Sequence, residues 1–530
     1  MESRYLVSTW AGVDAEEEAD LQTGMISFYS RGSFLRGVLA ASLLAMCLPR
    51  AAEARPRLPA VIGGGMVLQR DVPLTIWGWA DAGEEITVAI GENKGVATAD
   101  AQGRWRVKLA AMKASAEPLR MTVAGRETIE LTDILVGEVW LGSGQSNMQM
   151  SVASSANGAK EIAAAENPKI RLFLVPLVPS GTPAEDVKAS WKVCNAANVP
   201  SFSAVAYFFG RELQKELGVP VGLIASSWGG TRIEPWIPPA GFASEPELQK
   251  ERDGIAAALA AFEKAPEPKP KHPLNSNGAA TGLYNGMIHP LVPFALRGAL
   301  WYQGESNLGA GMRYHTLMRG LIQGWRATWG QGDFPFLFVQ LAPFKYKAKD
   351  TVLPEIWEAQ TETLKLPNTG MAVTTDITTV NDIHPPNKQD VGRRLALWAL
   401  AKTYGKTNLV FSGPLFESMK VERSRVRLNF SNVGGGLVTR DAKMLTDFFV
   451  AGADKKFFPA LATIVGGEFL VVSAPQVPNP VAVRFGWNQT AEPNFGNQAG
   501  LPASPFRTDR WTDAEMVRDA VDPNAPPVKK

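Results

Sequence analysis

The chain has 530 residues, of which 45% are hydrophobic and 20% are charged. This balance is typical of a globular protein, and the length predicts about two to four domains rather than one. Lys and Arg number 54 against 52 Asp and Glu, a formal net charge of +2, so composition gives no reason to expect nucleic acid as a partner.

The N-terminal segment, residues 1–54, has the pattern of a secretory signal peptide. An apolar run at residues 38–48 follows two arginines and precedes an Ala-x-Ala exit, at Arg31, Arg36, Ala52 and Ala54. The run is far shorter than the roughly 20 residues of a bilayer span. Met25 is an alternative start, because acidic residues precede the basic ones, and an ordinary buried helix is the alternative structure. We expect a secreted or periplasmic protein with no membrane contact after cleavage.

Residues 55–132 alternate between apolar and polar positions with period two, between glycine-containing turns. Four short runs carry this pattern, at residues 73–79, 86–90, 105–109 and 119–123. Short alternating strands at this spacing are typical of a small β-sandwich, which we expect as the N-terminal domain.

Residues 133–405 alternate apolar strand-like runs with amphipathic helical stretches, which predicts a parallel sheet with helices on both faces. The expected strands are residues 134–141, 170–175, 219–225, 296–301, 336–341 and 371–375. The expected helices are residues 204–217, 314–329, 356–366 and 388–404, the last with Asn387 and Asp390 spaced as in a capping box. A charged, proline-rich stretch at about 240–273 is expected to be an insertion, with one amphipathic piece around residues 248–262.

The period returns to two after Gly405, so residues 406–510 are expected to form a second β region. Its expected strands are residues 421–430, 469–473 and 481–485. The tail at residues 511–530 ends in a run rich in proline and lysine and is expected to be disordered.

Residues suited to acyl transfer follow four of the expected central strands. Ligands bind at the carboxyl ends of strands in an open α/β sheet, and the residues that follow those ends include Ser146, Gly229, Gln303 and His384. A serine hydroxyl becomes a good nucleophile when a base takes its proton, and imidazole suits that role near neutral pH. We therefore predict Ser146 as the nucleophile and His384 as the base.

The oxyanion of the same reaction needs hydrogen-bond donors, which a glycine turn and a side-chain amide can both provide. We predict the backbone N–H groups of Ser146 and of Gly229 or Gly230, together with the amide of Gln303. Each of these residues taken alone also fits a structural role, as a turn residue or a loop contact.

The other histidines and the cysteine fit structural roles better. His272 lies in the charged insertion, His289 precedes a proline and His315 lies on a polar helix face, so His384 is the best candidate base. Cleavage would leave Cys194 as the only cysteine, with no internal disulfide and no thiolate metal site. We expect Cys194 to be packed rather than reactive, and we expect neither a metal nor a cofactor.

Five ordered blocks of sequence resemble the sialate O-acetylesterase family, a branch of the SGNH hydrolases. They are GEVWLGSGQSNMQM at 137–150, SWGGTRIEPW at 227–236, LYNGMIHP at 283–290, WYQGESN at 301–307 and DIHPPNKQDVGRRLAL at 382–397. The resemblance runs from about residue 58 to residue 509. It implies an α/β fold with a flavodoxin-like core, a nucleophile at Ser146 and a base at His384, with Gln303 where more distant SGNH hydrolases carry an oxyanion-hole Asn.

The resemblance leaves the third member of a catalytic triad open. Many SGNH hydrolases carry an Asp three residues before the His, but Asn381 stands there in this chain. Asp382 is our first choice for orienting the imidazole. The alternatives are Asp376, Glu305, which also fits a buried carboxylate that holds the Gln303 loop, or a plain Ser–His dyad.

These observations predict a secreted carbohydrate O-acetylesterase that works through an acetyl-serine intermediate and, by the resemblance, acts on sialic acid. The alternative is the same chemistry on acetylated xylan or xyloglucan, because the matched residues act on the acetyl group and not on the sugar. A non-catalytic glycan-binding protein is disfavoured because Ser146, His384 and Gln303 are all present. Neither the sugar nor the oligomeric state follows from the sequence. Further residues that could line the pocket or be structural are Glu305, Asn307, Trp228, Arg232, Glu234, Trp236 and Asn285.

Overall fold

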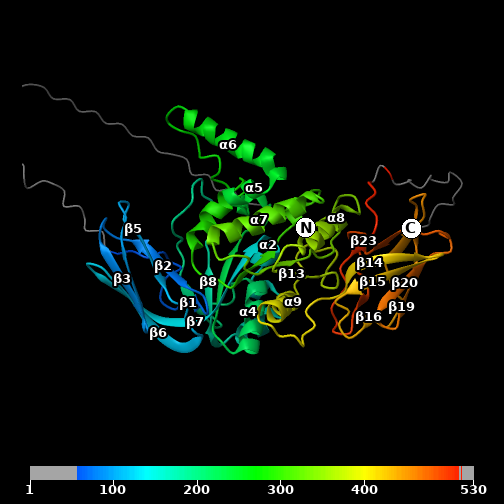
Figure 1. The fold of residues 1–530 in the computed structure, drawn as a ribbon, viewed down its shortest axis with the longest axis horizontal. Coiled ribbons are helices and arrows are strands. Elements are labelled where there is room, and N and C mark those ends of the chain that lie inside the picture. Colours follow the sequence, from blue (N-terminus) through cyan, green and yellow to red (C-terminus); the bar gives the residue numbers. More distant parts are fainter. Residues whose placement is uncertain (1–55, 513–514, 516–530) are drawn as a thin grey trace, which may run out of the picture. The chain divides into compact units, whose positions relative to one another are not determined.

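The structure, a computed structural model, describes residues 56–512 and residue 515 and has a mixed α/β fold (Figure 1). The predicted signal segment 1–54, with its alternative start, lies outside the described residues, as does nearly all of the tail predicted to be disordered. Within the described range, no helix has both the length and the apolar character needed to cross a membrane.

The centre of the fold is a sheet of six parallel strands with an antiparallel strand at one edge, in the order β13-β12-β11-β7-β10-β8-β9. Each of the six core strands expected from the sequence has a counterpart here, whereas β9 has none among the expected strands. The strands are β7 (Thr128–Gly144), β8 (Asn167–Leu174), β9 (Trp191–Cys194), β10 (Val221–Ser227), β11 (Gly298–Tyr302), β12 (Phe336–Val339) and β13 (Thr369–Ala372).

The strand order differs from the flavodoxin-like order implied by the resemblance. Numbered along the chain, the six parallel strands have the order 2-3-1-4-5-6, whereas flavodoxin-like sheets have the order 2-1-3-4-5. The difference arises because β10 lies between β7 and β8. The progression of strands still reverses beside β7, so the carboxyl end of β7 lies at the switch point where such sheets bind ligands.

Helices cover both faces of this sheet (Figure 1). On one face α4 (Ala204–Leu217) packs against α9 (Lys388–Trp398), and Phe209 of α4 contacts Trp140 of β7. On the other face Trp325 of α7 (Arg313–Trp329) contacts Trp301 of β11. Trp301 is paired with Ser143, three residues after Trp140, so the side chains of Trp301 and Trp140 point to opposite faces of the sheet. Further helices are α2 (Ser146–Gln149), α3 (Gly158–Ala163), α5 (Pro239–Ser244), α6 (Gln249–Lys264) and α8 (Val352–Thr363).

The predicted insertion includes α6, which corresponds to its expected amphipathic piece. None of the residues of α6 is buried, and the helix lies outside the packed layers in Figure 1. The helix α6 therefore contributes little to the core, whereas Phe242 and Leu248, earlier in the predicted insertion, are buried in it. The expected helix at residues 388–404 is α9 followed by a π-helical turn at Ala399–Thr403.

The N-terminal β region shares strand β7 with the central sheet. The first half of β7 pairs with β6 and β1, and its second half pairs with β10 and β11. The buried side chains of both regions form one hydrophobic core. The predicted boundary at residues 132–133 falls inside β7, which runs from Thr128 to Gly144. The other strands of this region are β1 (Val67–Gln69), β2 (Leu74–Trp79), β3 (Glu85–Ile90), β4 (Asn93–Thr98), β5 (Arg104–Leu109) and β6 (Ser115–Ala124).

The C-terminal β region has a hydrophobic core of its own. The expected strand 421–430 corresponds to β15, but its first two residues are the end of the paired strand β14, and a turn at Arg423, which has a φ of +58°, joins the two strands. No glycine or proline marks this turn in the sequence. The strands are β14 (Leu415–Glu422), β15 (Arg425–Ser431), β16 (Leu437–Thr439), β17 (Phe448–Ala451), β18 (Phe457–Pro459), β19 (Leu461–Val465), β20 (Phe469–Ser473), β21 (Ala482–Phe485), β22 (Phe495–Asn497) and β23 (Phe506–Arg507).

Candidate active site

Ser146 is the first residue of α2, just beyond the carboxyl end of β7. The turn between them is tight, because Gly144 has a φ of +141° and a Cβ atom there would lie 2.2 Å from the carbonyl oxygen of Tyr302. The backbone N–H of Gln145 donates to the same carbonyl at 3.0 Å. The small residues seen in the sequence therefore let β7 and β11 end side by side, with Ser146 at the rim of the sheet.

His384 is the histidine that the fold brings to Ser146. Its Nε2 lies 2.8 Å from the hydroxyl oxygen of Ser146, so the hydroxyl can donate to an unprotonated Nε2. This is the contact that a general base needs in order to activate a serine. The other histidines form hydrogen bonds elsewhere, at His272, His289 and His315.

Asp382 is the carboxylate that comes nearest to the imidazole. Its Oδ1 accepts the backbone N–H of His384 at 2.9 Å and lies 3.9 Å from the ring Nδ1. The second distance is longer than a hydrogen bond, and the Asp382 side chain is 62% exposed. The other two carboxylates considered for this role, Asp376 and Glu305, are hydrogen-bonded to other residues.

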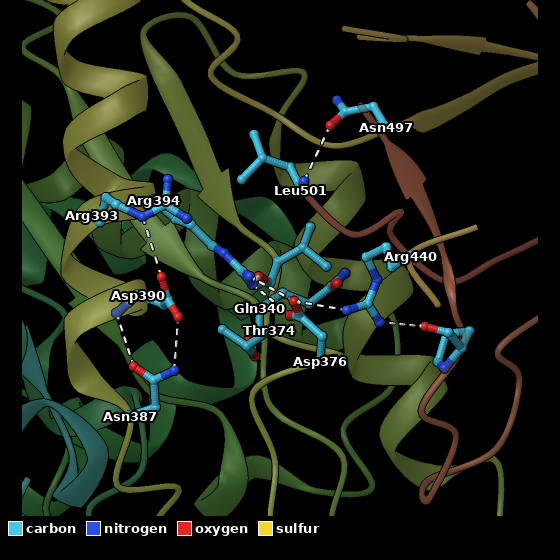
Figure 2. Close-up of polar contacts among 12 residues, drawn as sticks. Gln340, Thr374, Asp376, Asn387, Asp390, Arg393, Arg394, Arg440, Asn497 and Leu501 are labelled. Atoms are coloured by element: carbon cyan, nitrogen blue, oxygen red, sulfur yellow. Dashed lines mark hydrogen bonds and ion pairs between the residues drawn. The ribbon is translucent and has the colours of Figure 1, made fainter. Parts of the chain in front are cut away.

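His384 lies on residues 373–387, which we call the base segment. Its first part is held by Asp376, which receives two hydrogen bonds from Arg394 at 2.6 and 2.7 Å (Figure 2). Arg440 of the C-terminal β region adds a contact to the same carboxylate at 3.2 Å. The C-terminal region therefore helps to hold the base segment.

The other end of the base segment is the start of α9. The side-chain oxygen of Asn387 accepts the backbone N–H of Asp390 at 3.1 Å, and its Nδ2 donates to the Asp390 carboxylate at 2.8 Å (Figure 2). This is the helix cap that the spacing predicts. It fixes the point at which the chain leaves the loop, a few residues beyond His384.

The glycine turn after β10 lies beside Ser146. A Cβ atom at Gly229 would lie 3.3 Å from the Cβ of Ser146. The N–H of Gly229 donates to the side-chain oxygen of Gln149 at 2.7 Å, so this N–H holds an oxygen acceptor next to the serine. The N–H groups of Ser146 and of Gly230, which has a φ of +73°, have no hydrogen-bond partner within the described part of the chain.

Gln303 differs from the expectation that its amide faces the oxyanion. The side chain is fully buried, and its Nε2 donates to the carbonyl oxygen of Thr231 at 3.2 Å and to Oδ1 of Asn307 at 2.8 Å. Its Oε1 accepts the hydroxyl of Tyr314 at 2.9 Å. Because both N–H groups are used inside the protein, this amide holds the loop and is not free for a ligand.

Asn307 connects Gln303 to an ion pair nearer the surface. Its Nδ2 donates at 3.0 Å to Glu234, which also pairs with Arg232 at 2.7 Å. Burial acts to raise the pKa of Glu234, but the hydrogen bonds from Arg232 and Asn307 outweigh it, and the pKa lies below its usual value. Arg232 is 57% exposed, so it is the end of this chain of contacts that a substrate can reach.

Two further pocket candidates are structural. Trp236 is fully buried, and Asn285 donates to two backbone carbonyls of another loop. Trp228 is half-buried, directly precedes Gly229 and donates its backbone N–H to Gly144 at 3.0 Å. Trp228 is therefore the aromatic candidate that stays available beside the glycine turn.

Two buried residues next to Ser146 and His384 are absent from the sequence prediction. Asn147 follows Ser146 in α2, and Lys388 lies in the first turn of α9 with no exposed surface. Burial lowers the pKa of Lys388 to about 7, against the opposing charges of Glu305 and Asp382. The sequence signal for both residues is their place inside the blocks that contain Ser146 and His384.

Clusters of metal ligands and the remaining cysteine were the other features to place in the described residues. No group of three or more His, Cys, Asp or Glu side chains in the described part of the chain could hold a metal ion. Cys194 is buried, and burial raises the pKa of its thiol to about 12. A thiol with so high a pKa is not a nucleophile near neutral pH, in agreement with the expectation that Cys194 is packed.

A family profile and two related proteins all connect this chain to acetylesterases. The profile of a family described as carbohydrate esterase, sialic acid-specific acetylesterase, matches residues 136–400. The sialate O-acetylesterase of Mus musculus is 32% identical over 512 residues, covering 85% of this chain and 94% of that protein. The sialate O-acetylesterase of Homo sapiens is 32% identical over 496 residues, covering 85% and 92%.

A solved structure adds a similarity of fold. The crystal structure of a novel carbohydrate acetylesterase from Xanthomonas citri matches with a TM-score of 0.78 and 38% sequence identity, covering 86% of this chain and 100% of that one. The similarity therefore extends well beyond the residues around Ser146.

Proposed function

We propose that this chain, which belongs to the carbohydrate esterase family of sialic acid-specific acetylesterases, removes O-acetyl groups from a carbohydrate through an acetyl-serine intermediate. As a member of that family it is a carboxylic ester hydrolase. The observation that carries the proposal is the distance of 2.8 Å between Nε2 of His384 and the hydroxyl of Ser146. The names of the curated relatives make O-acetylated sialic acid the first substrate. Acetylated xylan or xyloglucan is the alternative substrate, because Ser146, His384 and their neighbours would contact the acetyl ester and would not select the sugar.

The reaction has two acyl-transfer steps. In the first, Oγ of Ser146 attacks the acetyl carbonyl carbon while Nε2 of His384 takes the hydroxyl proton. The tetrahedral intermediate then releases the sugar hydroxyl, which receives that proton, and leaves an acetyl group on Ser146. In the second step a water molecule, deprotonated by His384, attacks the acetyl-serine, and acetate and free Ser146 are formed.

The negative oxygen of each tetrahedral intermediate needs nearby donors. We assign this role to the backbone N–H groups of Ser146, Gly229 and Gly230. The hydrogen bond from Gly229 to the carboxamide oxygen of Gln149 supports the assignment, since it places an oxygen acceptor beside the serine. Substrate would replace that oxygen. Gln303 then supports the loop from behind rather than the oxyanion.

Asp382 is the residue that we propose for the third role. Its carboxylate can stabilise the imidazolium that forms when His384 takes the proton, and it holds the backbone of His384 at 2.9 Å. We also propose that the protein is secreted or periplasmic, from the signal-like pattern of residues 1–54. We propose in addition that residues 133–405 are the catalytic domain, between the N-terminal β region at 55–132 and the C-terminal β domain at 406–510.

Acetate release tests this function directly. The purified protein is incubated with O-acetylated sialic acid and with acetylated xylan, and Ser146→Ala is assayed in parallel. We expect the wild type to release acetate and the Ser146→Ala variant to lose at least about 10⁴-fold in kcat. A preference for xylan would transfer the proposal to the plant-wall substrate. Full activity in Ser146→Ala would refute the serine mechanism.

A further inference from the structure

Asn147 links the two halves of the Ser146–His384 pair. It follows Ser146 in α2, and its side chain is buried. Its Nδ2 donates at 2.9 Å to the backbone carbonyl oxygen of Ile383, the residue directly before His384. The carboxamide of Asn147 therefore links the residue after the nucleophile to the backbone directly before the base. Asn147 and Ile383 are 236 positions apart in the sequence.

The carboxamide of Asn147 is itself held at both ends. Its Nδ2 also donates to Oε1 of Glu305 at 2.6 Å, and its Oδ1 accepts Nζ of Lys388 at 2.5 Å. A backbone carbonyl can only accept a hydrogen bond and an ammonium can only donate one, so the partners determine which end of the amide is nitrogen. Both N–H groups and the oxygen of Asn147 are used in this one orientation.

Lys388 is an unusual partner for a buried amide. It has no exposed surface, and the charged groups that act on it are Glu305 and Asp382, while the ring of Tyr302 lies 5.3 Å from its Nζ. Burial of an ammonium is costly, and an apolar side chain could fill the same space at lower cost. Packing alone therefore does not account for a lysine here, whereas its hydrogen bond to Asn147 does.

We propose that Asn147 is a positioning residue for His384, and that Lys388 and Glu305 hold its carboxamide in the orientation that keeps the imidazole against Ser146. The inference rests on the proposed function, because it takes Ser146 and His384 as the reacting pair. It assigns the placement of the base chiefly to a buried set of hydrogen bonds, whereas Asp382 reaches the same loop from the solvent side.

The test uses Asn147→Ala and Asn147→Asp in the full chain, with 4-nitrophenyl acetate as substrate and a fluorophosphonate to count reactive serines. The Asp variant keeps the size of the side chain but loses both N–H donors. We expect kcat per reactive serine to fall about 10- to 100-fold in both variants, with little change in KM, because a small misplacement of a catalytic group has an effect of this size.

Asn497→Ala is the matched control. Asn497 is also fully buried and also uses Nδ2 for two hydrogen bonds, in its case to the backbone carbonyls of Ser412 and Asn432. Its oxygen accepts the backbone N–H of Leu501 in the C-terminal β region (Figure 2). Loss of this amide should lower the melting temperature and leave kcat per reactive serine unchanged. The control therefore measures the effect of losing a buried amide as such.

A pH profile separates positioning from packing. Lys388 loses its proton as the pH rises through about 7, and its hydrogen bond to Asn147 then loses the assistance of charge. We expect kcat of the wild type to decline as the pH rises through this value, and the decline to be absent in Lys388→Met. A residue with a purely structural role would change the melting temperature without changing this profile.

Two outcomes distinguish failure of the inference from failure of the proposed function. Unchanged kcat per reactive serine and an unchanged pH profile in both Asn147 variants would overturn the positioning role while leaving the function in place. If instead Ser146→Ala keeps full activity and the fluorophosphonate labels another residue, the proposed function itself fails, and the inference fails with it.

Discussion

The segments that carry Ser146 and His384 are held in opposite ways. Residues 137–150, the nucleophile segment, form the end of a central strand and the one-turn helix α2, and 11 of the 14 residues are buried. The base segment has no strand or helix of its own, and the His384 side chain is 41% exposed. Backbone packing therefore fixes the nucleophile, whereas side chains from other segments fix the base. We expect changes that crowd the backbone of the first segment to impair folding, and we expect loss of the base itself to impair chemistry with the fold intact.

Gly144→Ala should have the largest effect, and it should act on folding. The new Cβ atom would lie 2.2 Å from the carbonyl oxygen of Tyr302, at a backbone φ of +141°. The nearest atoms all belong to the backbone of Tyr302, which cannot move aside as a flexible side chain could. We therefore expect a loss of at least about 3 kcal/mol in the free energy of unfolding, or no folded protein. Urea unfolding and the yield of soluble protein measure it.

Gly254→Ala is the control for this change. Gly254 lies in α6, and no atom approaches the position of an added Cβ within 4 Å. We expect this variant to be as stable as the wild type or slightly more stable. A normally stable Gly144→Ala protein would show that the turn before Ser146 tolerates side chains, and the contrast between the two segments would lose its basis.

His384→Ala should give the next largest effect, with the fold intact. The side chain is partly exposed, and its ring nitrogens face Ser146 and Asp382 at the site itself, so the melting temperature should change little. Loss of the base should lower kcat by about 10⁴-fold or more. Acetate release measures it, with His272→Ala as the control that keeps activity. A melting temperature that falls as far as that of Gly144→Ala would contradict the contrast.

The same contrast explains which parts of the site the sequence could predict. Ser146 and its turn follow from local sequence, because an apolar run followed by small residues indicates a strand end with a close backbone approach. The cap of α9 by Asn387 is equally local, since its partner Asp390 is three residues away. Local patterns of this kind also predicted all six parallel strands of the central sheet.

Features that depend on distant partners could not be predicted. Gln303 follows β11 as expected, but only the fold shows that its amide is used by Thr231 and Asn307. The contact between Asn147 and Ile383 joins residues 236 positions apart. The strand order could not follow from alternation either, because alternation predicts parallel strands but not which strands are neighbours.

Arg394→Gln tests whether the base segment depends on side chains from elsewhere. Arg394 is 6% exposed and gives Asp376 two hydrogen bonds. Its loss should leave that carboxylate buried and poorly paired, which costs about 3 kcal/mol in the free energy of unfolding. We expect kcat in the protein that remains folded to fall about 10- to 100-fold, because the loop before His384 loosens.

Arg440→Gln is the graded comparison for Arg394→Gln. Arg440 is 24% exposed and makes one contact to Asp376 at 3.2 Å, so the pair with Arg394 survives its loss. We expect a change of less than about 1 kcal/mol in the free energy of unfolding and nearly normal kcat. Equal effects of the two variants would show that the C-terminal β region holds the base segment as strongly as α9 does.

Asp382→Asn should lower kcat less than Arg394→Gln does. The carboxylate of Asp382 lies 3.9 Å from Nδ1 of His384, which is too far for a hydrogen bond. It does accept the backbone N–H of His384, at 2.9 Å. An asparagine oxygen can accept the same N–H, so we expect kcat to fall by roughly tenfold at most. Asp382→Ala, which removes that acceptor too, should lose more, and the difference between the variants measures how far Asp382 acts through the backbone.

A fall of about 10⁴-fold in Asp382→Asn would have a definite structural meaning, because an aspartate that bonds the ring Nδ1 directly has an effect of that size. It would show that the base segment closes on substrate binding until Asp382 reaches Nδ1, which apo catalytic sites often allow. The base would then be held by a triad during turnover, and the buried contacts of Asn147 would set only its resting position. A fall of tenfold or less would leave His384 positioned from the protein interior.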